Sequence, residues 1–196
     1  MNHETEIITG WKPPRYIITG EQGEGKTTLL LRILAELTKQ NVNIGGIAAP
    51  GYFKDGIRSG FDVLDVRSGT SEKLCTTNPT ENSLLYGRYY FRPEGLLFGT
   101  DALNRSFLQE KVDLLVIDEV GKFELSGKVW GESIDLIMKN PYLPMIWTVR
   151  RPFVEEITKK WPMSRQNVIA VGSEDHEQII HDMMADIQRY RSETTL

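Results

Sequence analysis

Apolar residues recur along this chain with two spacings, one typical of buried strands and the other of amphipathic helices. Short apolar or alternating runs predict strands at residues 16–19, 42–49, 61–66, 84–91, 114–117, 144–149 and 168–171. Apolar positions at helical spacing predict helices at residues 26–40, 100–110, 132–139, 152–160 and 177–190. Residues 50–60 are rich in turn-forming residues and predict a loop.

Strands and helices alternate over most of the chain, and this order indicates the fold class. Alternation of this kind predicts an α/β fold with a mostly parallel sheet and helices on both of its faces. We expect residues 84–91 to add an antiparallel hairpin to that sheet. Residues 1–14 are mainly polar and end in two prolines, so they predict a loosely ordered lead-in to one globular domain at residues 15–196.

Composition and net charge limit the classes of binding partner that we expect for this chain. The chain has 196 residues, of which 40% are hydrophobic, enough for one substantial core. Its net charge of -4 argues against sequence-independent binding of nucleic acid, because such binding depends on an excess of Lys and Arg. No apolar run is long enough to cross a bilayer, and the single cysteine, Cys75, cannot form an intramolecular disulfide. We therefore expect a cytoplasmic protein without a membrane partner.

Residues 20–27, Gly-Glu-Gln-Gly-Glu-Gly-Lys-Thr, match the G-x-x-x-x-G-K-[ST] pattern of a phosphate-binding loop, or P-loop. The segment lies between a predicted strand and a predicted helix, where the backbone N–H groups of such a loop face the phosphates of a nucleotide. Lys26 is expected to contact the β- and γ-phosphates, and the hydroxyl of Thr27 to bind Mg²⁺. The predicted nucleotide-binding residues are Gly20, Glu21, Gln22, Gly23, Glu24, Gly25, Lys26, Thr27 and Thr28.

Two residues of the P-loop, Glu21 and Glu24, are acidic. Carboxylates inside the loop would repel a polyphosphate unless both side chains point to solvent. The orientation of these two side chains therefore bears on how tightly the loop binds a nucleotide.

An acidic pair follows the most apolar predicted strand. Residues 114–117 are Leu-Leu-Val-Ile, and Asp118 and Glu119 come directly after them, as in the Walker B segment that lies beside a P-loop. Asp118 is expected to hold Mg²⁺ directly or through a water, and Glu119 to orient and deprotonate the water that attacks the γ-phosphorus. Residues 118–121 also match the D-x-x-G pattern of regulatory GTPases, but the chain has no N-K-x-D or T-K-x-D element for reading guanine. The motifs therefore favour a Mg²⁺-dependent P-loop NTPase over a GTPase switch.

The chain resembles the THEP1 family of small nucleoside-triphosphatases over residues 17–171. The most specific block is Val-Ile-Asp-Glu-Val-Gly-Lys-Phe-Glu-Leu at residues 116–125, and residues 58–63, 87–89 and 153–157 resemble further family segments in the same order. The resemblance implies a RecA-like core with an additional strand between the P-loop strand and the acidic strand. It also implies Mg²⁺-dependent hydrolysis, slow turnover and a broad choice among ATP, GTP, CTP and UTP.

Arginines are candidates for contact with the transferring phosphoryl group, because a well-placed arginine can raise the rate by about 10³ to 10⁵. Arg150 and Arg151 follow a predicted core strand, at the end where its ligands bind. Arg150 joins Lys26 and Glu119 as a predicted catalytic residue. Arg58 and Arg88 are candidates mainly through the family resemblance.

Two alternatives to a hydrolase remain open from the sequence. A small-molecule or nucleotide kinase could use the same loop and acidic pair if the fold also offers an acceptor pocket. A nucleotide-gated adaptor could hydrolyse slowly and signal to a protein partner that the sequence does not identify. Phosphate release in the absence of an acceptor would distinguish a hydrolase from a kinase.

Overall fold

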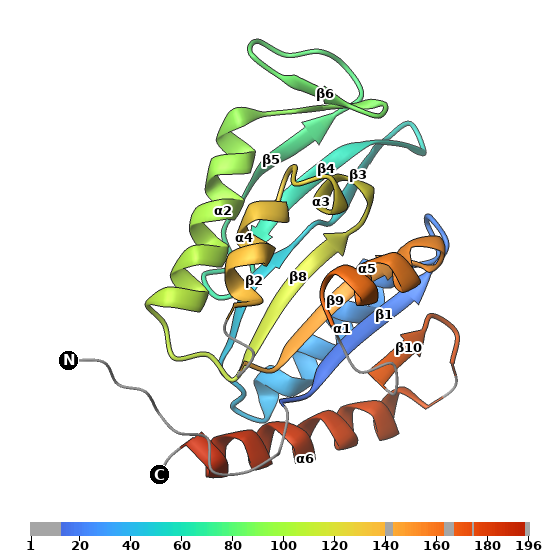
Figure 1. Ribbon diagram of the computed structural model, residues 1–196. Helices are drawn as coiled ribbons and strands as arrows, with labels where there is room; N and C mark the ends of the chain where they lie inside the picture. Colours follow the sequence, from blue (N-terminus) through green and yellow to red (C-terminus); the bar gives the residue numbers. More distant parts are fainter. Residues whose placement is uncertain (1–12, 140–142, 163–166, 174, 195–196) are drawn as a thin grey trace, which may run out of the picture.

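The computed structural model describes residues 13–139, 143–162, 167–173 and 175–194 (Figure 1). The predicted lead-in therefore lies outside the described residues, except for Pro13 and Pro14. The strands are β1 Arg15–Gly20, β2 Ile44–Ala48, β3 Gly51–Lys54, β4 Ile57–Asp65, β5 Ser71–Thr76, β6 Leu84–Tyr86, β7 Tyr89–Phe91, β8 Leu114–Val120, β9 Met145–Arg150 and β10 Val168–Ala170. The helices are α1 Lys26–Lys39, α2 Pro93–Leu108, α3 Lys122–Leu125, α4 Gly131–Ile137, α5 Val154–Lys160 and α6 His176–Thr194, and a 3₁₀ turn, Arg151–Phe153, precedes α5.

All the described strands join one sheet, in the order β10-β1-β9-β8-β2-β4-β5-β7-β6, with β3 paired to β4. The strands from β10 to β2 are parallel, whereas β4 and the strands beyond it pair antiparallel. Strand β9 lies between the P-loop strand β1 and the acidic strand β8, so Trp147 pairs with Ile17 on one side and Ile117 on the other. The additional strand of a RecA-like core is therefore present, and the predicted α/β P-loop fold is confirmed.

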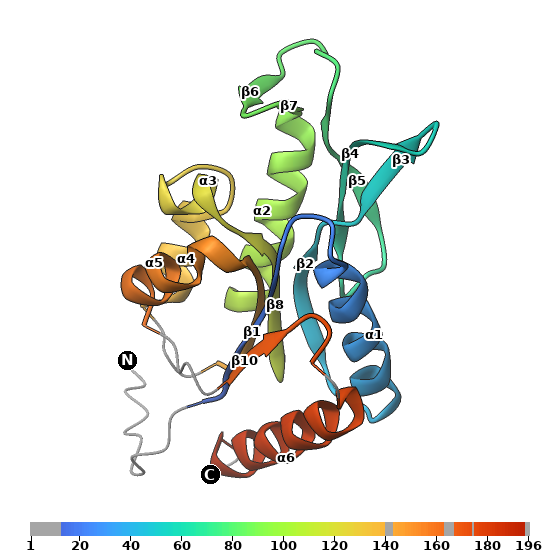
Figure 2. The same ribbon diagram turned by 90° about the vertical axis from the view of Figure 1, so that its right-hand side faces the viewer.

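Helices cover both faces of the parallel part of the sheet, as Figure 2 shows. Along β8, Leu114 and Val116 join the buried cluster formed with α1 and α6. The alternate residues Leu115 and Ile117 join the cluster formed with α2, α4 and α5. A strand that is buried on both faces is apolar at every position, which explains the continuous apolar run in the sequence.

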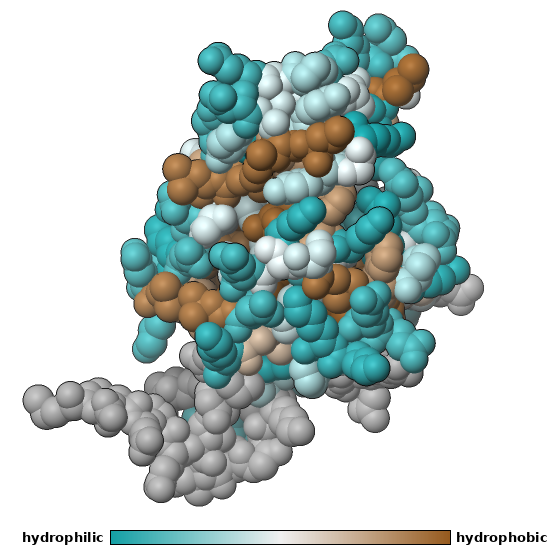
Figure 3. Space-filling model, turned by 45° about the horizontal axis from the view of Figure 1, so that its top comes forward, coloured by the Kyte–Doolittle hydropathy of each residue, from teal (hydrophilic) through white to brown (hydrophobic). Residues whose placement is uncertain are grey.

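The surface carries both polar and apolar side chains. On the face shown in Figure 3, apolar side chains form a brown band within a largely polar surround. The large apolar side chains that are exposed in the described part of the chain are Phe53, Ile57, Leu84, Leu85, Leu97, Leu108 and Leu136. Among the described residues, no helix combines the length and the apolar character needed to span a membrane.

The antiparallel part of the sheet is larger than the sequence predicted. Residues 50–60, predicted as a loop, contain strand β3 and the start of β4. Asp55 and Gly56 form the two-residue turn between them, both with positive φ, 51° and 74°. An Asp-Gly pair favours the twisted turn of a β-hairpin, so the local signal was present in the sequence. The hairpin predicted at residues 84–91 is confirmed as β6 and β7, whereas β5 was not predicted.

Helix α2 begins at Pro93, earlier than the predicted start at residue 100. Proline at the first turn and Glu94 beside it are normal signals for a helix N-terminus. The apolar pattern missed this part of the helix because its buried positions include Gly95 and Gly99. A Cβ atom on Gly99 would lie 2.3 Å from Cη2 of Trp130, so the helix can approach only because the side chain is absent.

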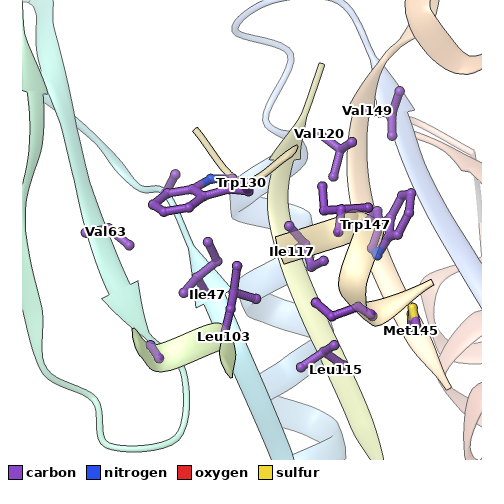
Figure 4. Close-up of a cluster of buried hydrophobic side chains, with 14 of the residues drawn as sticks. Ile47, Val63, Leu103, Leu115, Ile117, Val120, Trp130, Met145, Trp147 and Val149 are labelled. Atoms are coloured by element: carbon purple, nitrogen blue, oxygen red, sulfur yellow. The ribbon is translucent and has the colours of Figure 1, made fainter. Parts of the chain in front are cut away.

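Trp130 fills the space between α2 and the sheet. Its indole is 2% exposed and belongs to the same buried cluster as Val63 and Ile117. Figure 4 shows the ring between Val63 of β4 and the β8 side chains, above Leu103 of α2. This packing fixes the segment from α3 to α4 over the carboxyl end of β8, next to the predicted acidic pair.

Candidate functional site

The P-loop connects β1 to α1 as predicted. Gly25 has φ of 94°, in the left-handed region that favours glycine, and it is the residue before the first turn of α1. No side chain caps the N-terminus of this helix. Its first N–H groups therefore remain available to an anion, which the helix dipole also favours.

Lys26 is buried between the P-loop and the acidic strand. Its ammonium group donates hydrogen bonds to the backbone carbonyls of Glu21, at 2.9 Å, and Gly20, at 3.3 Å. The same nitrogen lies 3.8 Å from Oε2 of Glu119. The side chain thus links the loop to the acidic pair, although the two segments are far apart in the sequence.

Asp118 lies at the centre of a buried hydrogen-bond network. Its carboxylate accepts hydrogen bonds from the hydroxyls of Thr27, at 3.3 Å, and Thr148, and from the backbone N–H of Ala49, at 2.9 Å. Burial raises the pKa of Asp118, and the negative charge of Glu119 raises it further, whereas the hydrogen bonds from Thr148, Ala49 and Thr27 lower it. The carboxylate is held in one orientation.

Thr27 and Asp118 place a hydroxyl oxygen and a carboxylate 3.3 Å apart, and both are ligand types that divalent cations take. The described residues contain no group of three or more His, Cys, Asp or Glu side chains that could hold a metal by themselves. Mg²⁺ is commonly bound by one or two protein oxygens, with waters and substrate phosphates completing the octahedron. One buried carboxylate next to one hydroxyl at the mouth of a P-loop fits that chemistry.

A bulge at the end of β8 lies at the acidic pair. Ile117 pairs with Trp147 and Val120 with Val149, so β8 has one residue more than β9 across this interval. A bulge redirects side chains at the end of a strand. Here both carboxylates reach the P-loop, Asp118 through Thr27 and Glu119 through Lys26.

Arg150 joins the site from the end of β9. Its Nε donates to Oε1 of Glu119 at 2.7 Å, and its Nη1 lies 3.5 Å from Oε1 of Gln22 in the P-loop. The site residues predicted from sequence in three separate segments therefore lie together at the carboxyl end of the parallel sheet. The structure also adds Thr148 and Ala49, which the motifs did not indicate.

The two acidic side chains of the P-loop lie on its outer surface. Glu21 is 53% exposed and Glu24 41% exposed, and the guanidinium of Arg151 is 3.9 Å and 3.7 Å from their carboxylates. Glu24 also accepts a hydrogen bond from the backbone N–H of Glu21 at 2.7 Å. The Glu21 side chain is thus exposed, whereas the carboxylate of Glu24 turns back onto the loop backbone, and the cation of Arg151 lies beside both.

A cavity of about 270 Å³ adjoins the site. Gln22, Thr27, Glu119 and Arg150 line one end of it. Seven aromatic residues form much of the remaining wall, and they come from β4, β6, β7, α3, the residue before α4 and the 3₁₀ turn before α5: Phe61, Tyr86, Tyr89, Phe91, Phe123, Trp130 and Phe153. Isolated aromatic residues in the sequence gave no signal for this cavity, because they come from distant segments.

The other candidate residues of the sequence lie outside this arrangement or at its edge. The guanidinium of Arg58 lies over the rings of Phe53 and Phe61 on the β3–β4 hairpin. Arg88, in the β6–β7 turn, is exposed and donates to the hydroxyl of Tyr89 at 2.7 Å. Cys75 is buried, and burial raises its pKa to about 12, which opposes a role as a nucleophile.

The family model, the related sequences and the similar solved structures agree with one another. A family model described as NTPase matches residues 15–184. A nucleoside-triphosphatase THEP1 from Korarchaeum cryptofilum is 31% identical over 86% of this chain and 84% of its own, and one from Methanothermobacter thermautotrophicus is 29% identical over 90% and 99%. The crystal structure of THEP1 from Aquifex aeolicus is 25% identical with a TM-score of 0.66, over 89% of this chain and 99% of that one. The solution structure of a human cancer-related nucleoside triphosphatase, 24% identical with a TM-score of 0.66 over 90% and 98%, shares the fold.

Proposed function

The chain belongs to the THEP1 family of nucleoside-triphosphatases, and from that membership we propose that it hydrolyses nucleoside triphosphates in a Mg²⁺-dependent reaction, with a water activated by Glu119. The proposal depends on one observation: the P-loop residue Thr27 contacts Asp118, and Lys26 contacts Glu119. These groups supply phosphate binding, metal binding and a base at one point, which is the set of parts that phosphoryl transfer to water requires.

The P-loop would bind the triphosphate through backbone N–H groups at the start of α1. The ammonium of Lys26 would move from the carbonyls of Gly20 and Glu21 toward the β- and γ-phosphate oxygens. Because this lysine is buried and already lies 3.8 Å from Glu119, only a short shift is needed.

Thr27 and Asp118 would hold Mg²⁺, the first through its hydroxyl and the second through its carboxylate, directly or through a water. When bound, the metal would neutralise charge on the β- and γ-phosphate oxygens. The chain supports this by fixing Asp118 with the hydroxyl of Thr148 and the backbone N–H of Ala49. Such supporting hydrogen bonds keep a ligand carboxylate in position.

Glu119 would accept the proton of the attacking water, and Arg150 would orient Glu119 and face the charge that develops on the γ-phosphoryl group. The support is the 2.7 Å hydrogen bond between Nε of Arg150 and Oε1 of Glu119, on the P-loop side of β8. The second carboxylate oxygen lies toward Lys26. A base held by two cations is positioned before substrate binds, which reduces the reorganisation that the reaction requires.

All the contacts proposed for the nucleotide are with its phosphates. We therefore propose ATP and GTP as substrates, with CTP and UTP accepted as well. The relatives are nucleoside-triphosphatases, a name that supports this broad class without specifying a base.

The experiment is phosphate release by wild type and Glu119→Gln with each of the four nucleotides, with and without Mg²⁺ and without any acceptor. General-base catalysis contributes roughly 10² to 10⁴ in rate, so the variant should lose at least about 10²-fold while it still binds nucleotide. Glu81→Gln, at an exposed position in the loop before β6, is the matched control.

Lys26→Ala should instead weaken nucleotide binding, measured by calorimetry with a nonhydrolysable analogue. Equal activity of Glu119→Gln and wild type would remove Glu119 from the mechanism. Nucleotide binding by wild type without phosphate release in the absence of an acceptor would replace the hydrolase with a kinase.

A further inference from the structure

The aromatic cavity beside Glu119 is larger than hydrolysis requires. A water needs only its own small volume, whereas this cavity has about 270 Å³. That volume approaches the range of about 300 to 1,000 Å³ in which proteins bind small organic molecules. Such sites are mostly apolar, with a few polar groups at fixed places, and this cavity has that composition.

The position of the cavity places it beyond the γ-phosphate. In the proposed reaction, the γ-phosphate lies next to Glu119, and the rest of the nucleotide extends away from that residue along the P-loop. Thr28, the residue that follows Thr27 in α1, is exposed and does not line the cavity, whereas Thr27 and Glu119 do. The cavity therefore lies where the group that attacks the γ-phosphorus approaches.

The wall of the cavity is suited to a flat ring. Tyr86, Phe91 and Phe123 form a mutually packed set, with ring centroids 5.4 to 5.8 Å apart. Phe61, Tyr89, Trp130 and Phe153 also line the cavity. Aromatic side chains pack favourably on other rings at such distances, so the wall favours an aromatic ligand over an aliphatic one.

The charged groups at the rim of the cavity favour an anion. Arg88 and Lys122 line it, are exposed, and form no ion pair within the described part of the chain. The two carboxylates on the wall are already engaged, Glu119 by Arg150 and Glu124 by the backbone N–H of Gly121 at 2.7 Å. A guanidinium and an ammonium without carboxylate partners are suited to bind a phosphate or carboxylate group.

We propose that this cavity binds a second small molecule, a planar aromatic compound that carries one phosphate or carboxylate group, and that the bound molecule displaces the attacking water from Glu119. The ring packs against the wall that Tyr86, Phe91 and Phe123 form on one side of the cavity, and the anionic group lies at Arg88 and Lys122. Phosphate release from a nucleotide therefore falls when the cavity is occupied. This inference rests on the proposed function for the position of the γ-phosphate.

Calorimetry tests binding directly, on protein saturated with Mg²⁺ and a nonhydrolysable ATP analogue so that the P-loop is filled. The probes are 1-naphthyl phosphate and 1-naphthoate, which differ in the anionic group, with methyl phosphate and 1-naphthalenemethanol as controls that lack the ring or the charge. We expect the two aromatic anions to bind at least about tenfold more tightly than either control, because they engage both parts of the site.

The double variant Arg88→Gln/Lys122→Gln should weaken binding of both aromatic anions at least about tenfold. Both residues are exposed, so the substitutions should leave the fold intact. The matched control, Arg92→Gln/Lys111→Gln, changes the same charges outside the cavity lining and should bind like wild type. Phosphate release by wild type should fall at least severalfold at saturating 1-naphthyl phosphate and much less in the Arg88/Lys122 variant.

Failure of both aromatic anions to bind, or equal binding by wild type and the Arg88/Lys122 variant, would overturn the proposal. Binding that the ATP analogue abolishes would also overturn it, because the cavity would then hold part of the nucleotide. Absence of phosphate release in wild type would instead count against the proposed hydrolysis, since the calorimetric result does not depend on turnover.

Discussion

Nε of Arg150, the last residue of β9, lies 2.7 Å from Oε1 of Glu119 near the end of the neighbouring strand β8. Lys26 approaches the other oxygen of the same carboxylate at 3.8 Å. Two cations from different segments thus hold one acidic side chain, and this pairing ties the orientation of the proposed base to the P-loop. We expect removal of either cation to change the direction of the carboxylate as well as the charge around it.

Arg150→Ala should reduce phosphate release by about 10² to 10³, because Glu119 loses its orienting partner and the developing phosphoryl charge loses a cation. Nucleotide binding, measured with a nonhydrolysable analogue, should change much less. Arg150→Lys should recover only part of the rate, since an ammonium cannot reproduce the geometry of a guanidinium. Full activity of the alanine variant would exclude Arg150 from the reaction, and Arg92→Ala serves as a control for general loss of positive charge.

The sequence predicts those parts of the site whose residues belong to contiguous motifs. The P-loop and the acidic pair each occupy a few successive residues, and their order within the parallel sheet follows from alternating strands and helices. Arg150 was predicted for a simpler reason, since it ends a core strand on the side where ligands bind.

The parts that the sequence does not predict depend on pairing between distant segments. The hydroxyl of Thr148 bonds Asp118 because β9 lies directly beside β8. No local sequence pattern predicts this hydrogen bond. The aromatic cavity has the same origin, since its wall combines β4, β7 and the segment around α3. Helix α2 was shortened in the prediction because small residues, Gly95 and Gly99, occupy its buried positions.

Thr148→Val should raise the Mg²⁺ concentration required for half-maximal phosphate release by about 10- to 100-fold, the usual effect of removing a partner that holds a metal-binding residue. The change preserves side-chain shape and removes only the hydroxyl that bonds Asp118. Thr148→Ser keeps that hydroxyl and should restore the wild-type requirement.

Thr19→Val is a sensitive control for this prediction. Thr19 lies on the neighbouring strand β1, and its buried hydroxyl has no hydrogen-bond partner among the described residues. Its replacement should leave the Mg²⁺ requirement unchanged. An equal shift in Thr19→Val and Thr148→Val would mean that the effect comes from the sheet rather than from Asp118.

Gly99→Ala should destabilise the protein by about 1 to 3 kcal/mol, because the new methyl group would lie 2.3 Å from the indole of Trp130. In an open helix the same change stabilises by up to about 1 kcal/mol, so the sign of the effect tests the contact. Urea denaturation of both proteins measures it. A double-mutant cycle with Trp130→Phe should show a smaller penalty for Gly99→Ala, and independent, additive effects would contradict the proposed clash.

The pH dependence of stability should report on Glu124, a buried residue on the wall of the cavity that accepts a hydrogen bond from the backbone N–H of Gly121. Burial, and to a lesser extent the charge of Glu119, raises the pKa of this carboxyl from 4.5 to about 7. The folded protein therefore holds a proton that the unfolded chain releases between these two values. The contribution of Glu124 to stability is complete below pH 4.5 and is lost as the pH rises toward 7.

Glu124→Gln keeps an oxygen that can accept the hydrogen bond from Gly121 but cannot ionise. Between pH 4.5 and 7 the free energy of unfolding of wild type should fall relative to this variant, by on the order of 1 to 3 kcal/mol. Denaturation of both proteins across that range measures the difference. Glu156→Gln, on the exposed side of α5, should show no such trend. A difference between wild type and Glu124→Gln that stays constant with pH would mean that Glu124 ionises as readily in the folded protein as in the unfolded chain. In that case water from the cavity would have to reach the carboxyl and offset its burial.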